Sequence, residues 1–307
     1  MTLAAVSAMP ENSAAVRRIA DFLRGFTIEA TRPTPADFED LQTVASKPEG
    51  LYLAAISSRP AAEMVEFAAA TRSAGFEPVP HLAVRNLPSR AAFDDLLSRL
   101  AGEAGVKRAL VIAGDADRAT GPYASALDAI ESGLLQRHGI VEIGIAGHPE
   151  GHPRVSMEVL DRALAAKVEA ARLTGLKLHI VTQFSFSAAA IEKWILRVRD
   201  LGIETPIRIG MAGPTRLATL LRYAARCGVK ASAQGLTRQG GLIKHLVGTS
   251  APDGVIRPLA EAAHRLGKVS AHFFSFGGVA ATARWVAAAA AGHITLDRAD
   301  GFRVEPP

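Results

Sequence analysis

The chain has 307 residues, 49% of them hydrophobic, so it is long enough to bury a full core, and intrinsic disorder is excluded. The net charge of +5 comes from scattered single lysines and arginines, which disfavours a nucleic-acid partner and suits small anionic ligands. One cysteine excludes a disulfide framework and fits a reducing compartment. Because no signal-peptide pattern or apolar run of ~20 residues is present, we expect a cytoplasmic protein without a membrane partner.

Short β-rich runs alternate with longer helical patterns along the chain. Eight strands are predicted at residues 26–31, 51–57, 77–84, 108–113, 141–146, 177–183, 207–211 and 269–276. Helices are predicted after them at residues 35–45, 60–74, 89–104, 123–137, 157–174, 188–201, 214–227 and 278–291. Several of these helices begin with serine, proline or aspartate, as helix starts do.

Eight strands, each followed by a helix, are typical of a (β/α)8 barrel, the TIM barrel. Residues 233–267 are predicted to hold two extra helices before the last strand, as an insertion. We expect residues 1–307 to form this single barrel as one catalytic domain. A doubly wound open sheet has the same alternation and remains an alternative, although no strand is followed by the Gly-x-Gly-x-x-Gly pattern of dinucleotide-binding folds.

In such a barrel, catalytic groups sit at the C-terminal ends of the strands. The polar residues at the predicted strand ends are Glu29, Ser57, Ser58, His81, Asp115, His148, His152, Gln183 and Ser275. Polar residues also mark strand ends for ordinary turn reasons, so their convergence on one barrel mouth matters more than any single residue.

Two carboxylates are candidates for chemistry. If Glu29 points into the barrel mouth, partial desolvation would raise its pKa and let it act as an acid near neutral pH. The alternative is an exposed or salt-bridged strand glutamate. Gly114 allows the backbone to approach a ligand, and Asp115 after it could accept two donors from a planar heterocycle. The alternative for Asp115 is a turn aspartate that caps the next segment.

His148 and His152 lie in the loop sequence Gly-His-Pro-Glu-Gly-His-Pro at 147–153. The prolines interrupt a helix, and no cysteine or second motif completes a ligand set, so no metal site is predicted. Binding of a phosphate or a flat ring is favoured, with hydrogen-bonded loop histidines as the alternative. The Gln183 carboxamide offers a donor and an acceptor to a pterin or amide edge. Phe184 and Phe186 are expected in the core.

Read in order, these residues resemble the methylenetetrahydrofolate reductase family. The matching pieces are Glu29, Pro-His-Leu at 80–82, Gly-Asp at 114–115, Tyr-Ala at 123–124, His-Pro-Glu-Gly-His-Pro at 148–153, Val-Thr-Gln-Phe at 181–184 with Phe186, and His-Phe-Phe at 272–274. They keep the family's order over nearly the whole chain. The Pro-Glu-x-His-Pro loop followed by Thr-Gln-Phe is the specific part.

The family is a (β/α)8 barrel that binds FAD and interconverts 5,10-methylene- and 5-methyltetrahydrofolate, usually with NADH or NADPH. The resemblance implies that Glu29 is the general acid that protonates N10, that Asp115 binds the pterin and tunes the flavin, and that Gln183 contacts folate. Flavin contacts are implied for Ser57, His81, Ala113, Gly114, Asp115, Tyr123, Ala124, His148, His152, Asp161 and Lys167. The implied partners are tetrahydrofolate derivatives, NAD(P)H and further copies of the chain in a homo-oligomer.

The chain departs from the family pattern at four places. Thr-Tyr-Gly-Ala reads Ala-Ile-Ser-Ser at 55–58, Arg-Gly-Asp reads Ala-Gly-Asp at 113–115, Arg-Lys reads Ala-Lys at 166–167, and Asn-Arg reads Gly-Gly at 277–278. Several of these positions touch flavin phosphates or substrate in the family. Because the sequence ends with the barrel, the C-terminal regulatory domain of the animal enzymes is not expected.

The departures leave three alternatives open. A divergent branch would serve one-carbon catabolism by oxidising methyl-tetrahydrofolate. A flavin-independent folate enzyme would be a direct nicotinamide reductase or a methyltransferase. A non-catalytic protein would keep the folate pocket without hydride transfer.

Overall fold

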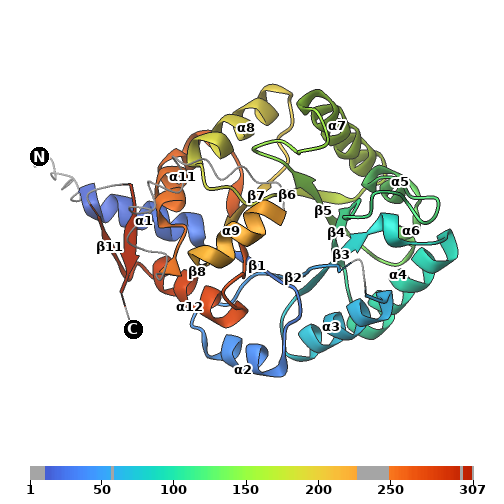
Figure 1. Ribbon diagram of the computed structural model, residues 1–307, viewed down its shortest axis with the longest axis horizontal. Helices are drawn as coiled ribbons and strands as arrows, with labels where there is room; N and C mark the ends of the chain where they lie inside the picture. The colour runs from blue at the N-terminus through green and yellow to red at the C-terminus, as the bar shows by residue number, and fades with distance from the viewer. Residues whose placement is uncertain (1–10, 57–58, 227–248, 298–299, 306–307) are drawn as a thin grey trace, which may run out of the picture.

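The centre of the molecule is a closed barrel of eight parallel strands in the order β1-β10-β7-β6-β5-β4-β3-β2 (Figure 1). The computed structural model describes residues 11–56, 59–226, 249–297 and 300–305. The barrel strands are β1 (Thr27–Ala30), β2 (Leu51–Leu53), β3 (Pro78–Ala83), β4 (Arg108–Ile112), β5 (Glu142–Gly147), β6 (Lys177–Thr182), β7 (Ile207–Ala212) and β10 (Val269–Phe274). All eight predicted strands are confirmed, and the open sheet is excluded because β1 pairs with β10 and closes the barrel.

Helices surround the barrel. They are α1 (Glu11–Leu23), α2 (Pro35–Thr43), α3 (Ala61–Ser73), α4 (Arg90–Ala104), α5 (Ala126–Glu131), α6 (Leu134–Arg137), α7 (Met157–Leu173), α8 (Ala188–Asp200), α9 (Leu217–Arg226), α11 (Asp253–Leu266) and α12 (Val279–Ala290), with a single 3-10 turn η1 at Val84–Asn86. Side chains at the helix starts explain several boundaries: Thr34 and Asp37 form a capping box before α2, and the Ser89 hydroxyl accepts from the amide of Ala92 in α4.

Two helix predictions need correction. The predicted helix at 123–137 is split into α5 and α6, because Gly133 takes a left-handed φ of 73° between them. Because α5 begins only at Ala126, Tyr123 lies in the loop before it. Helix α1, which precedes the first strand and packs against α11, α12 and β10, was not among the predicted helices.

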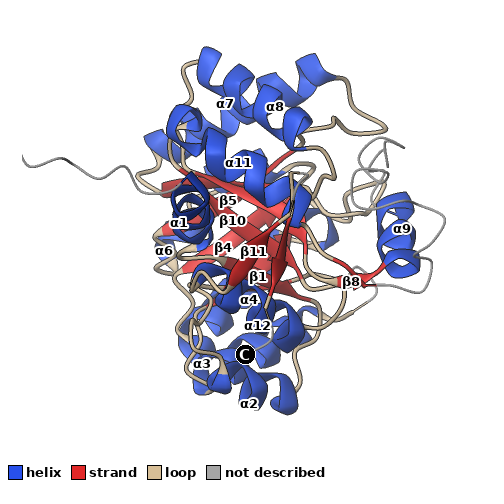
Figure 2. Ribbon diagram, turned by 90° about the vertical axis from the view of Figure 1, so that its left-hand side faces the viewer, coloured by secondary structure: helices blue, strands red, loops and turns tan. Residues whose placement is uncertain are grey.

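The seventh position of the outer ring is filled by α11. This helix packs between α8 and α1 and buries Val255, Ile256 and Leu259. It is therefore a regular barrel helix, not an insertion as predicted; the second helix predicted in 233–267 falls partly outside the described residues. Instead, α9 stands off the ring together with β8 (Thr215–Arg216), which pairs with β9 (Thr249–Ser250) (Figure 2). Because β8 follows directly from the end of β7, this extra unit sits at the C-terminal mouth.

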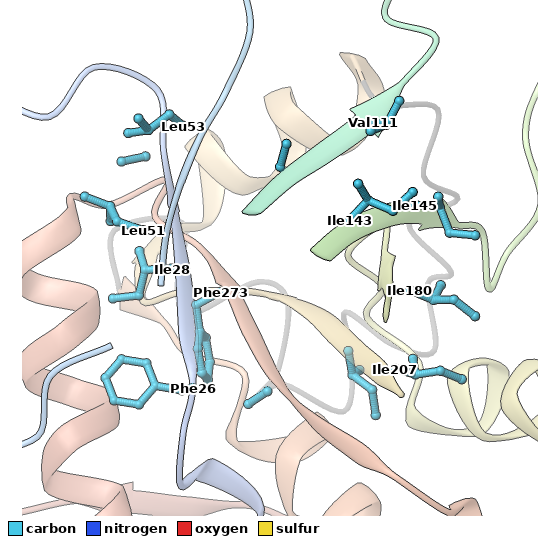
Figure 3. Close-up of a cluster of buried hydrophobic side chains, with 14 of the residues drawn as sticks. Phe26, Ile28, Leu51, Leu53, Val111, Ile143, Ile145, Ile180, Ile207 and Phe273 are labelled. Atoms are coloured by element: carbon cyan, nitrogen blue, oxygen red, sulfur yellow. The ribbon is translucent and has the colours of Figure 1, made fainter. Parts of the chain in front are cut away.

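The main hydrophobic core lies between the strands and the helices. Strand residues that face outward, among them Ile28, Val111, Ile145 and Phe273, are fully buried there (Figure 3). In β1, Ile28 points outward into this layer, so its neighbours Thr27 and Glu29 point into the barrel. The alternation of side chains along a strand thus separates an apolar outer layer from the inside of the barrel.

The inside of the barrel is unusually polar. A small apolar cluster of Tyr52, Val79, Leu110 and Val181 shares it with the buried residues Thr27, His81, His179, His272 and Arg208. Branched aliphatic side chains normally fill this space in (β/α)8 barrels. Gly144 makes room for one of the imidazoles, since a Cβ there would stand 2.7 Å from Nε2 of His179.

Two smaller features complete the fold. A hairpin of β11 (Ile294–Leu296) and β12 (Phe302–Val304) packs beside α1, α11 and α12. Among the helices of the described ranges, none combines the length and apolar character that crossing a bilayer requires.

Candidate active site

Glu29 lies at the C-terminal end of β1 between two imidazoles. Its Oε2 is 3.5 Å from Nε2 of His81 on β3 and 3.9 Å from Nε2 of His272 on β10. The carboxyl side chain is 17% exposed, toward the mouth, while both imidazoles are buried. The Ser275 hydroxyl donates to the Glu29 backbone carbonyl at 2.6 Å and ties the end of β10 to β1. Glu29 is therefore neither a surface glutamate nor one paired to lysine or arginine among the described residues.

The environment favours the protonated acid. Burial raises the pKa of Glu29, and His81 only partly opposes this. Burial also lowers the pKa of His81, and burial with the charge of Arg208 and the ring of His179 lowers the pKa of His272 to about 3. The imidazoles of His81 and His272 are therefore neutral near pH 7 and do not pair with Glu29 as cations, and the raised pKa of Glu29 favours a proton on its carboxyl group. Such a group can deliver a proton, which is the requirement for a general acid.

Below Glu29 a polar chain continues down the barrel. The Tyr52 hydroxyl and Nε2 of His179 are 2.7 Å apart, and Nδ1 of His179 is 2.9 Å from Oε1 of Glu142. Tyr52 also packs its ring edge-on against His272, with ring centres 4.7 Å apart. The position of the His272 imidazole is thus fixed by the ring of Tyr52, and the position of Tyr52 is set by its hydrogen bond to His179.

The N-terminal end of the barrel carries paired charges. Arg208 contacts Glu49 at 3.1 Å, and Arg108 lies 3.4 Å from Glu49 and 3.5 Å from Glu142. A cavity of about 450 Å³ opens here, lined in part by Lys177 and His179. The hydrogen bond to His179, with help from its charge and from both arginines, lowers the pKa of Glu142. Both glutamates of this end have ionic partners, in contrast to Glu29.

His148 and His152 come together at the end of β5. Their rings are perpendicular with centres 5.6 Å apart, and both are half-buried. Burial, then the charge of Lys167, lowers the pKa of His148 to about 4, and burial lowers the pKa of Lys167 to about 8. Glu150 of the same loop accepts from the Ser185 hydroxyl at 2.5 Å. Within the described residues no His, Cys, Asp and Glu cluster could hold a metal ion.

Arg85 organises the neighbouring loop, which the sequence analysis did not foresee. Its guanidinium donates to the carbonyl oxygens of Ala124 and Ala116 at 2.7 and 3.1 Å, and its backbone amide donates to Ala113. The charge also contributes to lowering the pKa of His152, after burial and the charge of Arg154. Arg85 therefore brings a cation to the rim where the motif at 113–115 lacks its arginine.

Asp115 is exposed at this rim, after Gly114 with a left-handed φ of 89°. A Cβ at Gly114 would stand 2.9 Å from Cβ of Ala83, so glycine allows the ends of β3 and β4 to approach. At the end of β6, Oε1 of Gln183 accepts from the backbone amide of Phe184 at 3.0 Å. The carboxamide nitrogen is the part of Gln183 that remains for a ligand.

The remaining residues expected to contact the flavin are Tyr123, Ala124, Asp161 and Ser57. Tyr123 is 4% exposed and packs edge-on against Phe93 in the outer core. The Asp161 carboxylate is paired with Arg197, and Ala124 is an exposed loop residue. Ser57 and Ser58 lie outside the described residues.

Five aromatic side chains, called the aromatic wall below, pack together beside the mouth. Phe184, Phe186, Phe274 and Phe276 contact one another, and Tyr223 of α9 stacks on Phe276 with ring centres 4.1 Å apart and an angle of 11°. Phe184 and Phe186 are buried, as predicted. The wall fixes α9 over the ends of β6, β7 and β10.

Residues 52–238, more than half of the chain, match the family model for methylenetetrahydrofolate reductase. The chain belongs to the methylenetetrahydrofolate reductase family. Membership of this family implies an enzyme of folate-related oxidation and reduction. The matched range contains Asp115, His148 and Gln183, while Glu29 and His272 lie outside it and are placed at the mouth by the fold.

Two solved structures are distant likenesses of the chain. A 2,3-dimethylmalate lyase, a member of the PEP mutase/isocitrate lyase superfamily, is 10% identical with a TM-score of 0.48, over 88% of this chain and 82% of the other. Dihydropteroate synthase from Thermus thermophilus is 15% identical with a TM-score of 0.46, over 85% of this chain and 91% of the other.

Proposed function

We propose that the protein is an FAD-dependent oxidoreductase that interconverts 5,10-methylene- and 5-methyltetrahydrofolate with NAD(P)H, with Glu29 as the general acid. The observation that carries the proposal is a desolvated carboxyl group between two neutral imidazoles at the mouth of a barrel of this family. The raised pKa of this group favours retention of its proton until a bound base accepts it.

Glu29 would deliver its proton to N10 of the folate as the five-membered ring opens. The O–H bond of Glu29 breaks, an N–H bond forms on the substrate, and the electron pair stays on the carboxylate. The Glu29 side chain is mostly buried, and Phe274 packs against the neighbouring His272, which would limit the water that competes for this proton. In the oxidative direction the same carboxylate would take the proton back.

The residues present at the mouth fit a flavin dinucleotide. Buried Nε2 of His81 lies 3.5 Å from Glu29 and has no hydrogen-bond partner among the described residues, so it could bond a ring bound at the mouth. Lys167, His148 and His152, with Arg85 nearby, would hold the anionic part of the group. When bound, FAD would supply hydride transfer to and from the folate carbon.

Asp115 and Gln183 would orient the folate. An exposed carboxylate at the end of β4 can accept the two parallel donors of a pterin edge, and the free carboxamide nitrogen of Gln183 can donate to an acceptor on the same ligand. Holding two flat rings in one orientation is a large part of the rate enhancement for such a reaction.

The visible spectrum of the purified protein is the first test. We expect flavin absorbance that is bleached by NADH or NADPH and recovered on addition of methylenetetrahydrofolate. A protein that contains no flavin and binds none when it is added would overturn the flavin part of the proposal.

A flavin-independent folate enzyme is the second candidate. It is favoured by the pairing of Asp161 with Arg197, which occupies a carboxylate expected to contact the flavin ribose. It predicts NAD(P)H-dependent folate reduction, or methyl transfer, by colourless protein. A non-catalytic folate-binding protein would instead bind tetrahydrofolate in calorimetry without oxidising NAD(P)H.

We also propose that residues 1–307 act as one catalytic domain in a cytoplasmic homo-oligomer, with oxidation of methyl-tetrahydrofolate in one-carbon catabolism as one direction of use. Sedimentation of the purified protein and steady-state rates in both directions test these points.

A further inference from the structure

His272 lies beside Glu29 but neither gives nor takes the proton in the proposed reaction. Its side chain is fully buried, its Nδ1 lies 2.8 Å from the Thr27 hydroxyl, and its Nε2 faces Glu29 without a hydrogen-bond partner among the described residues. Thr27 and His272 are direct partners in the β1–β10 register. The sheet itself therefore sets the contact between the hydroxyl and the imidazole.

The hydrogen-bond inventory assigns the proton of this imidazole. Among the described residues, His272 is the single partner of the Thr27 hydroxyl. If Nδ1 carried the proton, the hydroxyl hydrogen would be buried with no acceptor among the described residues, whereas a proton on Nε2 faces Oε2 of Glu29, 3.9 Å away, which can accept it once the carboxyl group ionises. The hydroxyl therefore donates to Nδ1, and a neutral imidazole then carries its proton on Nε2.

We propose that His272, oriented by Thr27, is a positioning residue that presents its Nε2–H to the carboxylate left when Glu29 gives up its proton. His81, with Nε2 at 3.5 Å from the same oxygen, stands on the other side of the carboxyl group. The inference deepens the proposed function, because it rests on Glu29 as the acid. No proton leaves His272; its N–H only donates a hydrogen bond to the new carboxylate.

The arrangement balances two opposing effects on Glu29. Burial alone makes the acid hold its proton too tightly, whereas an imidazole donor stabilises the carboxylate and makes release easier. Around this pair, Tyr52 packs on His272 from β2, and Arg208 of β7 and His179 of β6 act on its charge state. These groups and His81 are the titratable or charged neighbours that face the pair.

The protonation state of His272 can be read directly in the unmodified full-length protein. Nitrogen NMR of histidine-labelled protein distinguishes the two neutral tautomers. We expect the Nε2–H form between pH 6 and 9. Observation of the Nδ1–H form would overturn the proposal without need of any variant.

The second readout is the pKa of Glu29, measured by carbon NMR of protein with labelled glutamate carboxyls. The Glu29 signal is assigned as the one that disappears in Glu29→Gln. In His272→Phe and Thr27→Val we expect this pKa to rise by about one pH unit, a tenfold change in the protonation constant. His272→Gln, whose amide keeps a donor, and Thr27→Ser, which keeps the hydroxyl, should restore most of the original value. A pKa that is the same in His272→Phe as in the unmodified protein would overturn the proposal.

Thr71→Val is the matched control, because Thr71 is a fully buried threonine on α3 whose hydroxyl has no partner among the described residues. It should leave the pKa of Glu29 and the tautomer unchanged. Since both readouts are spectroscopic, they hold whether or not folate is turned over. If the protein showed the expected tautomer but did not turn over folate, the proposed function would be wrong, while the coupling of His272 to Glu29 would still hold.

Discussion

The two ends of the barrel interior are both polar, yet they differ in how their carboxylates are partnered. At the N-terminal end, Glu49 and Glu142 each contact cationic or imidazole groups. At the C-terminal end, Glu29 faces two neutral imidazoles and no lysine or arginine within 4.0 Å among the described residues. Paired charges hold the barrel together, whereas a desolvated acid without a cation is ready to exchange a proton.

The largest expected effect is on catalysis at the C-terminal end. Glu29→Gln keeps size and polarity but removes the proton. We expect the folate half-reaction to slow by roughly 10²–10⁴-fold, while reduction of bound flavin by NAD(P)H is unchanged. Stopped-flow measurement of the two half-reactions checks this; full folate turnover in the variant would end the assignment of Glu29 as the acid.

At the N-terminal end the expected effect is on stability. Arg208→Met removes a buried guanidinium from Glu49 and should lower the free energy of unfolding by about 2 kcal/mol, less than for a fully buried pair because Glu49 also contacts Arg108 and is partly exposed. Urea unfolding measures the change. Arg265→Met, which breaks an exposed pair with Glu192, is the control and should cost less than about 1 kcal/mol.

Asp253 extends the comparison beyond the barrel. Burial raises its pKa to about 6 from an ordinary 3.8, with Asp297 adding to the effect. A carboxyl whose pKa is raised on folding costs stability above the folded pKa, and the cost disappears as pH falls below the unfolded pKa. Asp253→Asn should therefore stabilise the protein by about 2–3 kcal/mol at pH 7 and by little near pH 3.5, as measured by urea unfolding at both pH values. An equal gain at both would contradict this cause.

The smallest expected effect concerns the connection between the two ends. Tyr52→Phe removes the hydroxyl bonded to His179 but keeps the ring against His272. We expect a loss of about 1 kcal/mol in unfolding free energy and a folate rate within a few fold of the original. A large loss of folate rate without a loss of stability would show that the two ends are coupled more closely than their contacts suggest.

The sequence was sufficient for the barrel because each strand is a short apolar run bounded by turn residues. It was also sufficient for the position of Glu29, since side chains alternate along a strand. The sequence did not predict the roles of α11 and α9, because both segments have helical patterns. Only the packing of α11 against α1 and α8 shows that it is the helix that completes the ring. Helix periodicity identifies a buried face and leaves its partner undetermined.

The site was predicted unevenly for a similar reason. His148 and His152 are close in sequence, so a short motif brings them together. The contact of His272 with Thr27 joins residues at opposite ends of the chain and depends on barrel closure, which no local pattern encodes. Arg85 was missed because its role is to bind the carbonyls of a distant loop, and any exposed arginine has the same local signature.

The seam between β1 and β10 has a consequence for how the protein matures. Of the eight barrel strands, the one that carries Glu29 is made first and the one that carries His272 is made last, and their pairing closes the barrel. Contacts of such long sequence separation carry a loop-closure entropy cost that slows folding. The acid therefore acquires its full environment only when the final strand docks, so a nascent or incompletely closed chain holds its reactive group in an unfinished setting.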